Sequence, residues 1–279
     1  MSDPEVIEYH YYYPPGVHRI LASGTSAFIG QVDESTVLKY TLERGGDSSR
    51  LEHEHRLLNI IGHHEHVIAH KGLTPDGLYL EYAENGSLLE FITKAKHAPA
   101  SLQQRIRWCR EIIEAVEHIH SKRVIHCDIN PTNILLDKNL NIKLADFQGC
   151  YLDEGGNVVV PACAGEPCRY FCPREDDFNA TRQTDLFALG STIHFIFTGH
   201  EVFPDIVAGE EFWDEKVRLR FVSGVFPSDN HACAEIAQKC WRQQYAAASE
   251  ILEEMRAIEN LYNRMPTRGK GDLYGDLVT

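Results

Sequence analysis

The feature that most constrains this chain is a pair of apolar runs that carry three side chains with oxygen ligands. Asp128 and Asn133 lie five residues apart within residues 124–136, and Asp146 follows Asn133 by thirteen residues, after a second apolar run. The runs are typical of short buried strands, and Pro131 indicates a turn. One carboxylate can deprotonate a hydroxyl, while an amide and a second carboxylate can hold Mg²⁺. The pattern therefore favours phosphoryl transfer from ATP.

Composition limits the class of protein further. The chain has 279 residues, of which 43% are hydrophobic, enough for one domain with a proper core. Its formal net charge of −14 disfavours binding to nucleic acid or to an anionic membrane. The acidic start at residues 1–5 is unlike a signal peptide, and the apolar stretch 186–198 is too short to span a bilayer. With eight cysteines but no secretory signal, we expect a monomeric intracellular protein, cytoplasmic or nuclear.

Hydrophobic periodicity predicts a strand-rich first part and a helical second part. Residues 20–82 are expected to form short strands with one helix over about 48–61, after an extended lead-in over residues 1–18. The second part is expected to contain short strands over 133–136 and 142–144, followed by a long irregular segment. The predicted helices of this part cover residues 102–120, 184–197, 211–219, 231–241 and 246–260.

The sequence His126-Cys-Asp-Ile-Asn-Pro-Thr-Asn133, followed by Asp146-Phe147, resembles the catalytic loop and metal-binding motif of eukaryotic protein kinases. The resemblance covers about residues 18–260 and is nearest to the small stand-alone kinase-domain proteins of filamentous fungi. It implies a two-lobed α+β fold. A small antiparallel β-sheet lobe with one helix would span about 18–80, a hinge 81–84, a mainly helical lobe 85–265 and a flexible tail 266–279.

The resemblance also implies roles for individual residues. Asp128 would be the catalytic base, and Asn133 and Asp146 would hold Mg²⁺. Lys39 would neutralise the ATP phosphates and Glu54 would orient it, with Glu52 as the alternative partner. Six further positions would bind the nucleotide through the glycine loop, the hinge and the walls of the adenine pocket. They are Gly24, Ile29, Val37, Glu81, Ala83 and Leu135.

Several positions depart from the family pattern. Gly24 is the only glycine left in the phosphate-covering loop, which weakens close backbone approach to phosphate. Asn130 stands where Ser/Thr kinases carry a lysine, and Pro167 stands where its threonine brace would be. Gln148 replaces the glycine of D-F-G, although Gly149 follows directly.

Further departures concern the response of the segment after Asp146 to phosphorylation. Cys127 replaces the arginine that pairs with a phosphorylated activation loop, and residues 146–175 contain no Ser or Thr. We therefore expect that phosphorylation of Ser or Thr in this loop does not switch the protein. Residues 172–175 replace A-P-E with a shifted glutamate, so the usual ion pair of that glutamate is absent or rewired. Asp185 resembles the family aspartate that holds the catalytic loop from the helix below.

Three functions are compatible with these residues. The first is an ATP- and Mg²⁺-dependent protein kinase that acts on a protein substrate, Ser/Thr-directed by default. The alternative is a pseudokinase that binds nucleotide or serves as a scaffold, and a third is phosphorylation of a small molecule. Neither of two further groups of residues is expected to bind a metal. We expect the histidines between positions 53 and 70 to face solvent, and Cys163, Cys168 and Cys172 to be free thiols.

Overall fold

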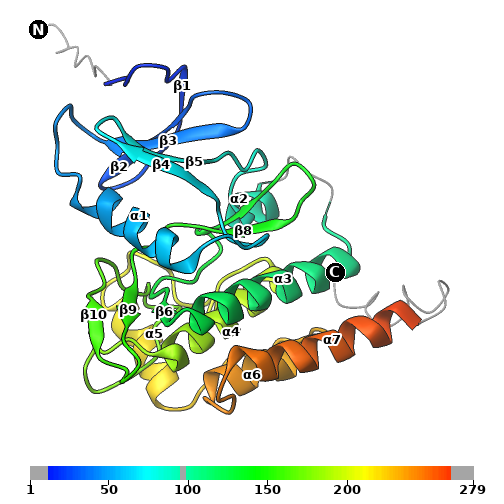
Figure 1. Cartoon of the computed structure of the whole chain (residues 1–279). Helices are drawn as coiled ribbons and strands as arrows, with labels where there is room; N and C mark the ends of the chain where they lie inside the picture. Colours follow the sequence, from blue (N-terminus) through cyan, green and yellow to red (C-terminus); the bar gives the residue numbers. More distant parts are fainter. Residues whose placement is uncertain (1–11, 95–98, 265–279) are drawn as a thin grey trace, which may run out of the picture. The chain divides into compact units, whose positions relative to one another are not determined.

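A computed structural model describes residues 12–94 and 99–264, and its contacts divide the chain into two compact units. The first unit contains the chain up to residue 56 together with residues 69–82, and the second contains residues 57–68 and the chain from residue 83 onward. Each unit is treated by itself below, and the elements are labelled in Figure 1.

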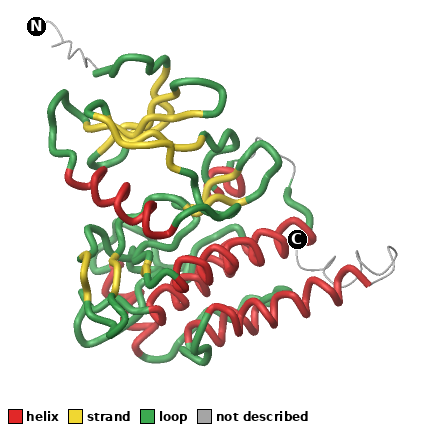
Figure 2. The backbone as a smooth tube through the Cα atoms, in the orientation of Figure 1, coloured by secondary structure: helices red, strands yellow, loops and turns green. Residues whose placement is uncertain are grey.

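The first unit is built on a five-stranded antiparallel sheet in the order β1-β2-β3-β5-β4 (Figures 1 and 2). The inner strands β2, β3 and β5 carry the buried positions of the sheet, and the buried Phe28, Leu38 and Tyr40 form one core cluster. Helix α1 starts in this unit and continues into the second. The elements are β1 (Arg19–Ser23), β2 (Ala27–Gln31), β3 (Thr36–Thr41), α1 (Ser49–Ile61), β4 (His70–Thr74) and β5 (Gly77–Glu81).

The second unit is mainly helical, and α4 lies at its centre. Residues Thr184 to Ile196 of α4 are buried on every side, so this helix is a core element rather than an amphipathic one. Helix α3 packs along α7, and α4 packs along α6, as Figure 1 shows. The helices are α2 (Leu88–Thr93), α3 (Leu102–Ser121), α4 (Arg182–Thr198), α5 (Trp213–Val222), α6 (Ala234–Trp241) and α7 (Ala248–Arg264).

Within the described part of the chain, five short strands flank the loops of the second unit. β7 (Ile134–Leu136) pairs with β8 (Ile142–Leu144), and β9 (Cys150–Leu152) lies between β6 (Val124–Ile125) and β10 (Val158–Val160). All these pairs are antiparallel, with Ile125 opposite Cys150. The residues on both sides of the catalytic loop are therefore fixed by backbone ladders.

Capping residues explain where the long helices begin and end. Ser101 accepts a hydrogen bond from the amide of Gln104 (3.2 Å) at the start of α3, which satisfies one of the amide groups left over at a helix N-terminus. Helix α4 ends at Gly199, whose left-handed φ of 77° is the conformation that glycine adopts without strain. No helix within residues 12–94 and 99–264 combines the length and apolar character that a transmembrane span needs.

The α+β fold class is confirmed, as are the helices and strands predicted by periodicity, with ends shifted by a few residues. One expectation was wrong: the segment after Leu144 is not wholly irregular, because residues 150–160 form the β9–β10 hairpin. The short helix α2 was not predicted individually. The predicted tail 266–279 and most of the lead-in 1–18 lie outside the described residues, and the lobe boundaries stay predictions.

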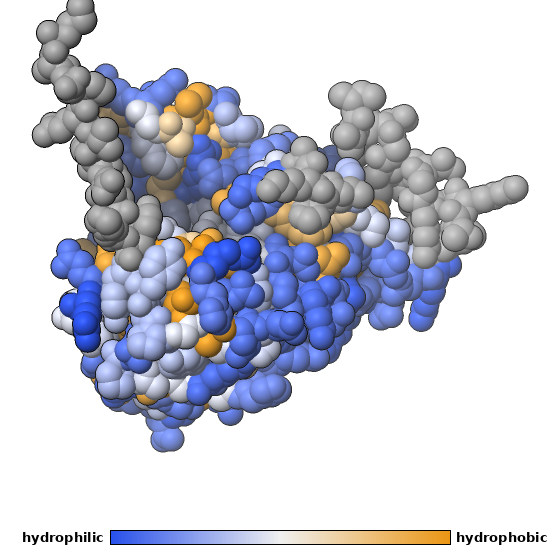
Figure 3. Space-filling model, turned by 90° about the horizontal axis from the view of Figure 1, so that it is seen from above, coloured by the Kyte–Doolittle hydropathy of each residue, from blue (hydrophilic) through white to orange (hydrophobic). Residues whose placement is uncertain are grey.

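The surface is mostly polar on the face that Figure 3 presents, with hydrophobic side chains in separate patches. Among the large hydrophobic residues of the described part, Phe178 is the most exposed, at 96%. Isolated exposed apolar side chains are normal for a globular protein, so their scatter alone does not mark an interface.

Candidate active site

Lys39 and Glu54 form an ion pair inside the first unit. Lys39 lies on β3, opposite Ile29 of β2 and Leu78 of β5, and its Nζ is 2.6 Å from Oε2 of Glu54 on α1. The Glu54 side chain is 1% exposed and that of Lys39 is 13% exposed, so the pair is shielded from water. Removing one member would leave the other charge buried without its partner.

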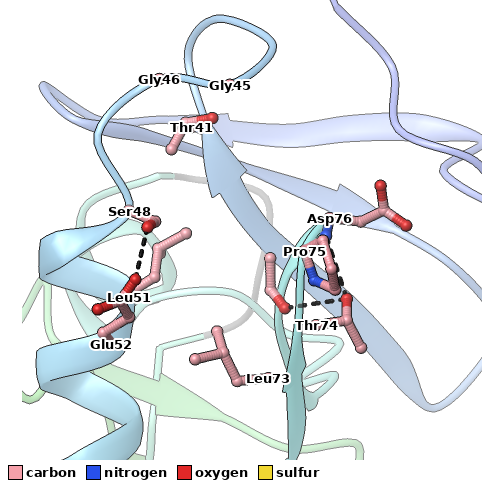
Figure 4. A pocket seen from close by; sticks show the side chains of 11 residues that line it. Thr41, Gly45, Gly46, Ser48, Leu51, Glu52, Leu73, Thr74, Pro75 and Asp76 are labelled. Carbon is pink, nitrogen blue, oxygen red and sulfur yellow. Dashed lines mark hydrogen bonds between the residues drawn. The ribbon is translucent and has the colours of Figure 1, made fainter.

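Glu52, the alternative partner, points elsewhere. Its Oε1 accepts a hydrogen bond from the Ser48 hydroxyl (2.7 Å) at the start of α1. Figure 4 shows both side chains at a cavity of about 510 Å³ between this helix start and the β4–β5 turn, where Thr74 and Asp76 lie. Of the two glutamates, the structure therefore pairs Glu54 with Lys39.

The remaining predicted nucleotide residues are divided between the units. Gly24 closes the β1–β2 turn, where its amide donates to the Ala27 carbonyl (2.9 Å). Ile29, Val37 and Glu81 lie on β2, β3 and β5 of the first unit. In the second unit, Leu135 lies on β7, and the Ala83 carbonyl accepts from the amide of Gly86 (3.2 Å).

Two side-chain amides hold the carboxylate of Asp128. Nδ2 of Asn133 donates to its Oδ2 (2.8 Å) and Nδ2 of Asn130 donates to its Oδ1 (2.7 Å). The Asn133 amide also donates to the Asp128 backbone carbonyl (2.9 Å). Asn130, the position occupied by lysine in Ser/Thr kinases, therefore fixes the carboxylate without adding a positive charge.

Burial raises the pKa of Asp128 to about 7, and the negative charge of Asp146 acts in the same direction. The amides of Asn133 and Asn130 oppose this rise because they stabilise the ionised form. A cation beside Asp146 would lower the pKa of Asp128, since an opposite charge favours the ionised carboxylate.

Asp185 anchors the backbone that precedes Asp128. This carboxylate, on α4 and fully buried, accepts hydrogen bonds from the amides of His126 (2.8 Å) and Cys127 (3.0 Å). It also lies 2.9 Å from Nε2 of His120. Cys127 has a left-handed φ of 64°, a strained conformation for a residue with a Cβ, which these contacts stabilise. The predicted structural role of Asp185 is confirmed.

The Asp146 segment packs directly on the catalytic loop. The Phe147 and His126 rings lie 4.9 Å apart, and Nε2 of His126 is 3.1 Å from the Ala145 carbonyl. A Cβ on Gly149 would lie 1.9 Å from the Ile125 carbonyl oxygen, a distance that no side chain could occupy. The structure therefore requires glycine at 149, one residue after the position of the D-F-G glycine.

An ion pair inside the segment after Asp146 was not predicted. Arg174 donates to both oxygens of Glu166 (3.3 and 2.9 Å), whose side chain is 1% exposed. The Arg174 guanidinium also lies 4.3 Å from the centre of the Phe171 ring. This pair uses Arg174, whereas Glu175, the shifted glutamate, is exposed. No motif or periodicity in the sequence predicted it.

The donor set of Asn133 and Asp146 fits a hard cation. An amide oxygen and a carboxylate oxygen are ligands that Mg²⁺ prefers, and the NH₂ end of Asn133 is turned toward Asp128, which leaves its oxygen end for a metal. Within residues 12–94 and 99–264, no cluster of three or more His, Cys, Asp or Glu side chains has the arrangement of a metal site.

Comparison with known proteins gives a match to the model of the protein kinase domain over residues 33–260. The chain is 32% identical over 161 residues to the serine/threonine-protein kinase SIK2 of Gallus gallus, which covers 55% of this chain and 20% of that protein. It is 27% identical over 217 residues to the SNF1-like protein kinase ssp2 of Schizosaccharomyces pombe, covering 72% of this chain and 37% of that protein. The chain thus spans a fifth to somewhat over a third of these relatives.

Proposed function

This chain belongs to the protein kinase domain family, and we propose that it transfers the γ-phosphate of ATP, with Mg²⁺, to a hydroxyl group of a protein. Serine or threonine is the proposed acceptor, because the relatives above are named as serine/threonine kinases or as an SNF1-like protein kinase. We further propose that it acts as an intracellular monomer, and that its net charge of −14 disfavours nucleic acid and anionic membranes as partners.

The main support for the proposal is that the structure fixes the orientation of the Asp128 carboxylate. Both of its oxygens accept hydrogen bonds from side-chain amides, so the group is oriented before a substrate arrives. In the proposed reaction Asp128 accepts the proton of the substrate hydroxyl. Bound Mg²⁺, held by Asn133 and Asp146, would neutralise the phosphate charge. Lys39, oriented by Glu54, would add a fixed positive charge for the phosphates.

A second candidate, a pseudokinase that binds nucleotide without transferring phosphate, is favoured by Asn130. Its amide brings no charge to a phosphate in transit, and its Nδ2 is already 2.7 Å from Asp128. The phosphate-covering loop, in which Gly24 is the only glycine left, also favours the pseudokinase candidate.

The test is phosphate transfer from Mg²⁺-ATP to a generic basic protein by the purified chain. Asp128→Asn and Lys39→Met are expected to abolish transfer, whereas the matched exposed changes Asp205→Asn and Lys216→Met should preserve it. Phosphoamino-acid analysis of the product distinguishes Ser and Thr from Tyr. If transfer is absent while Mg²⁺-ATP still raises the melting temperature, the pseudokinase candidate replaces the proposal. If neither effect is seen, both candidates fail.

A further inference from the structure

Two thiols, Cys127 and Cys150, lie together beside the catalytic loop. Cys150 begins β9 and is opposite Ile125 in the β6–β9 ladder, and Cys127 follows Ile125 by two residues. The three side chains form one buried cluster. Each thiol shifts the pKa of the other, and the Cys127 thiol is 3.6 Å from the Ile125 carbonyl oxygen.

A cavity makes this pair reachable. Cys127 and Cys150 are only 1% and 3% exposed, yet both line a cavity of about 560 Å³ in the second unit. Pro161, Ala162 and Phe178 supply apolar parts of its wall. A molecule of the size of hydrogen peroxide can therefore come beside two cysteines that bulk solvent barely touches.

We propose that Cys127 and Cys150 are an oxidation site, at which a hydroperoxide converts the two thiols into a reversible disulfide. The inference does not depend on the proposed kinase activity, because it concerns only the chemistry of the two sulfur atoms. Its consequence is structural: Cys127 directly precedes Asp128, so the new bond would tie β9 to the catalytic loop.

The electronic environment assigns the roles of the two thiols. Cys127 lowers the pKa of the Cys150 thiol, although burial opposes this, and Cys150 together with burial raises the pKa of Cys127. Cys150 is therefore the more acidic of the two thiols and the proposed nucleophile, and Cys127 is the thiol that resolves the intermediate.

The reaction balances in two steps. The Cys150 thiolate attacks one oxygen of the hydroperoxide, an S–O bond forms as the O–O bond breaks, and the leaving oxygen takes up a proton. The Cys127 sulfur then attacks the Cys150 sulfur of the sulfenic acid. An S–S bond forms, the S–O bond breaks, and the Cys127 proton leaves with the hydroxide as water. Two thiols are oxidised by two electrons, and hydrogen peroxide is reduced to two molecules of water.

A second thiol pair serves as an internal control. Cys233 raises the pKa of the neighbouring Cys109 thiol, but both cysteines are 0% exposed and neither lines this cavity. If access through the cavity matters, this pair should stay reduced under conditions that oxidise Cys127 and Cys150.

The experiment treats the full chain with hydrogen peroxide, blocks remaining thiols under denaturing conditions, and maps disulfides by mass spectrometry without reduction. Trypsin releases Cys127 in the peptide 124–138, and cleavage after Glu154 separates Cys150 from Cys163 and Cys168. We expect one crosslinked pair, 124–138 with 144–154, that lacks two hydrogens and returns to the free peptides with dithiothreitol.

Variants make the test specific. Cys150→Ser and Cys127→Ser should each remove the crosslink, whereas Cys163→Ser, in the wall of the same cavity, should leave it unchanged. The inference is overturned if Cys127 and Cys150 remain fully alkylatable after peroxide treatment of the wild type. It is equally overturned if Cys150 pairs with Cys163 instead, or if Cys109 and Cys233 oxidise as fast. The wild-type map decides even if a serine variant fails to fold.

Discussion

Replacing Asp185 by asparagine removes one of the two oxygens that hold the catalytic loop. The carboxylate is 0% exposed, accepts from the amides of His126 and Cys127, and lies 2.9 Å from Nε2 of His120. Asparagine offers one oxygen and turns an NH₂ group toward a former donor. At least one buried amide then loses its acceptor, at about 1–3 kcal/mol, and the other bonds lose their charge assistance.

Together these losses predict that Asp185→Asn lowers the free energy of unfolding of the second unit by about 2–4 kcal/mol, of which about 1 kcal/mol is the difference between hydrogen bonds to a charged and to a neutral acceptor. Urea denaturation followed by tryptophan fluorescence measures this change. Trp108, Trp213 and Trp241 are the only tryptophans and all belong to the second unit, so the signal reports that unit.

The control is Asp205→Asn, which removes an exposed ion pair with Arg220 and should shift the urea midpoint little. The reasoning about Asp185 would be refuted if its variant lost less than about 1 kcal/mol at an unchanged m-value, or if it behaved like the control.

Two further predictions concern the second unit. Gly149→Ala should destabilise it by more than about 2 kcal/mol, because the new Cβ would meet the Ile125 carbonyl oxygen, whereas Gly165→Ala meets nothing within 4 Å and should be nearly neutral in the same urea titration. Burial lowers the pKa of His194 to about 4, so between pH 6.5 and 4 the unfolded state binds a proton that the folded state excludes. Stability should therefore fall as the pH decreases through this window, by up to about 1.4 kcal/mol per pH unit for this group. His194→Phe should flatten that slope in denaturation curves measured at several pH values, and an unchanged slope would contradict the assignment.

The catalytic-loop segment was predictable because its chemistry and its secondary structure are encoded in neighbouring residues. Asp128 and Asn133 lie five residues apart, and the helices and strands around them follow a clear hydrophobic period. The sequence favoured Glu54 over Glu52 as the partner of Lys39 but left Glu52 open, because both glutamates lie on α1, and the structure decides for Glu54.

Other features carried weaker signals. The β9–β10 hairpin has strands of only three residues, joined through Gly155 and Gly156, too short for a period-two pattern to be read with certainty. The Glu166–Arg174 contact joins two residues of one irregular segment, where no periodicity predicts which side chains meet. The pairing of Cys127 with Cys150 depends on the register of β6 against β9, which the sequence does not specify.

The Glu166–Arg174 contact has a consequence for how quickly a cell could change the state of this protein. Other enzymes add and remove a phosphate on a loop, whereas the side chains of Glu166 and Arg174 are permanent parts of the protein. Residues 146–175 offer no Ser or Thr for such editing. We therefore expect that an upstream Ser/Thr kinase does not change the order of this segment, because the contact that holds it lasts as long as the molecule does.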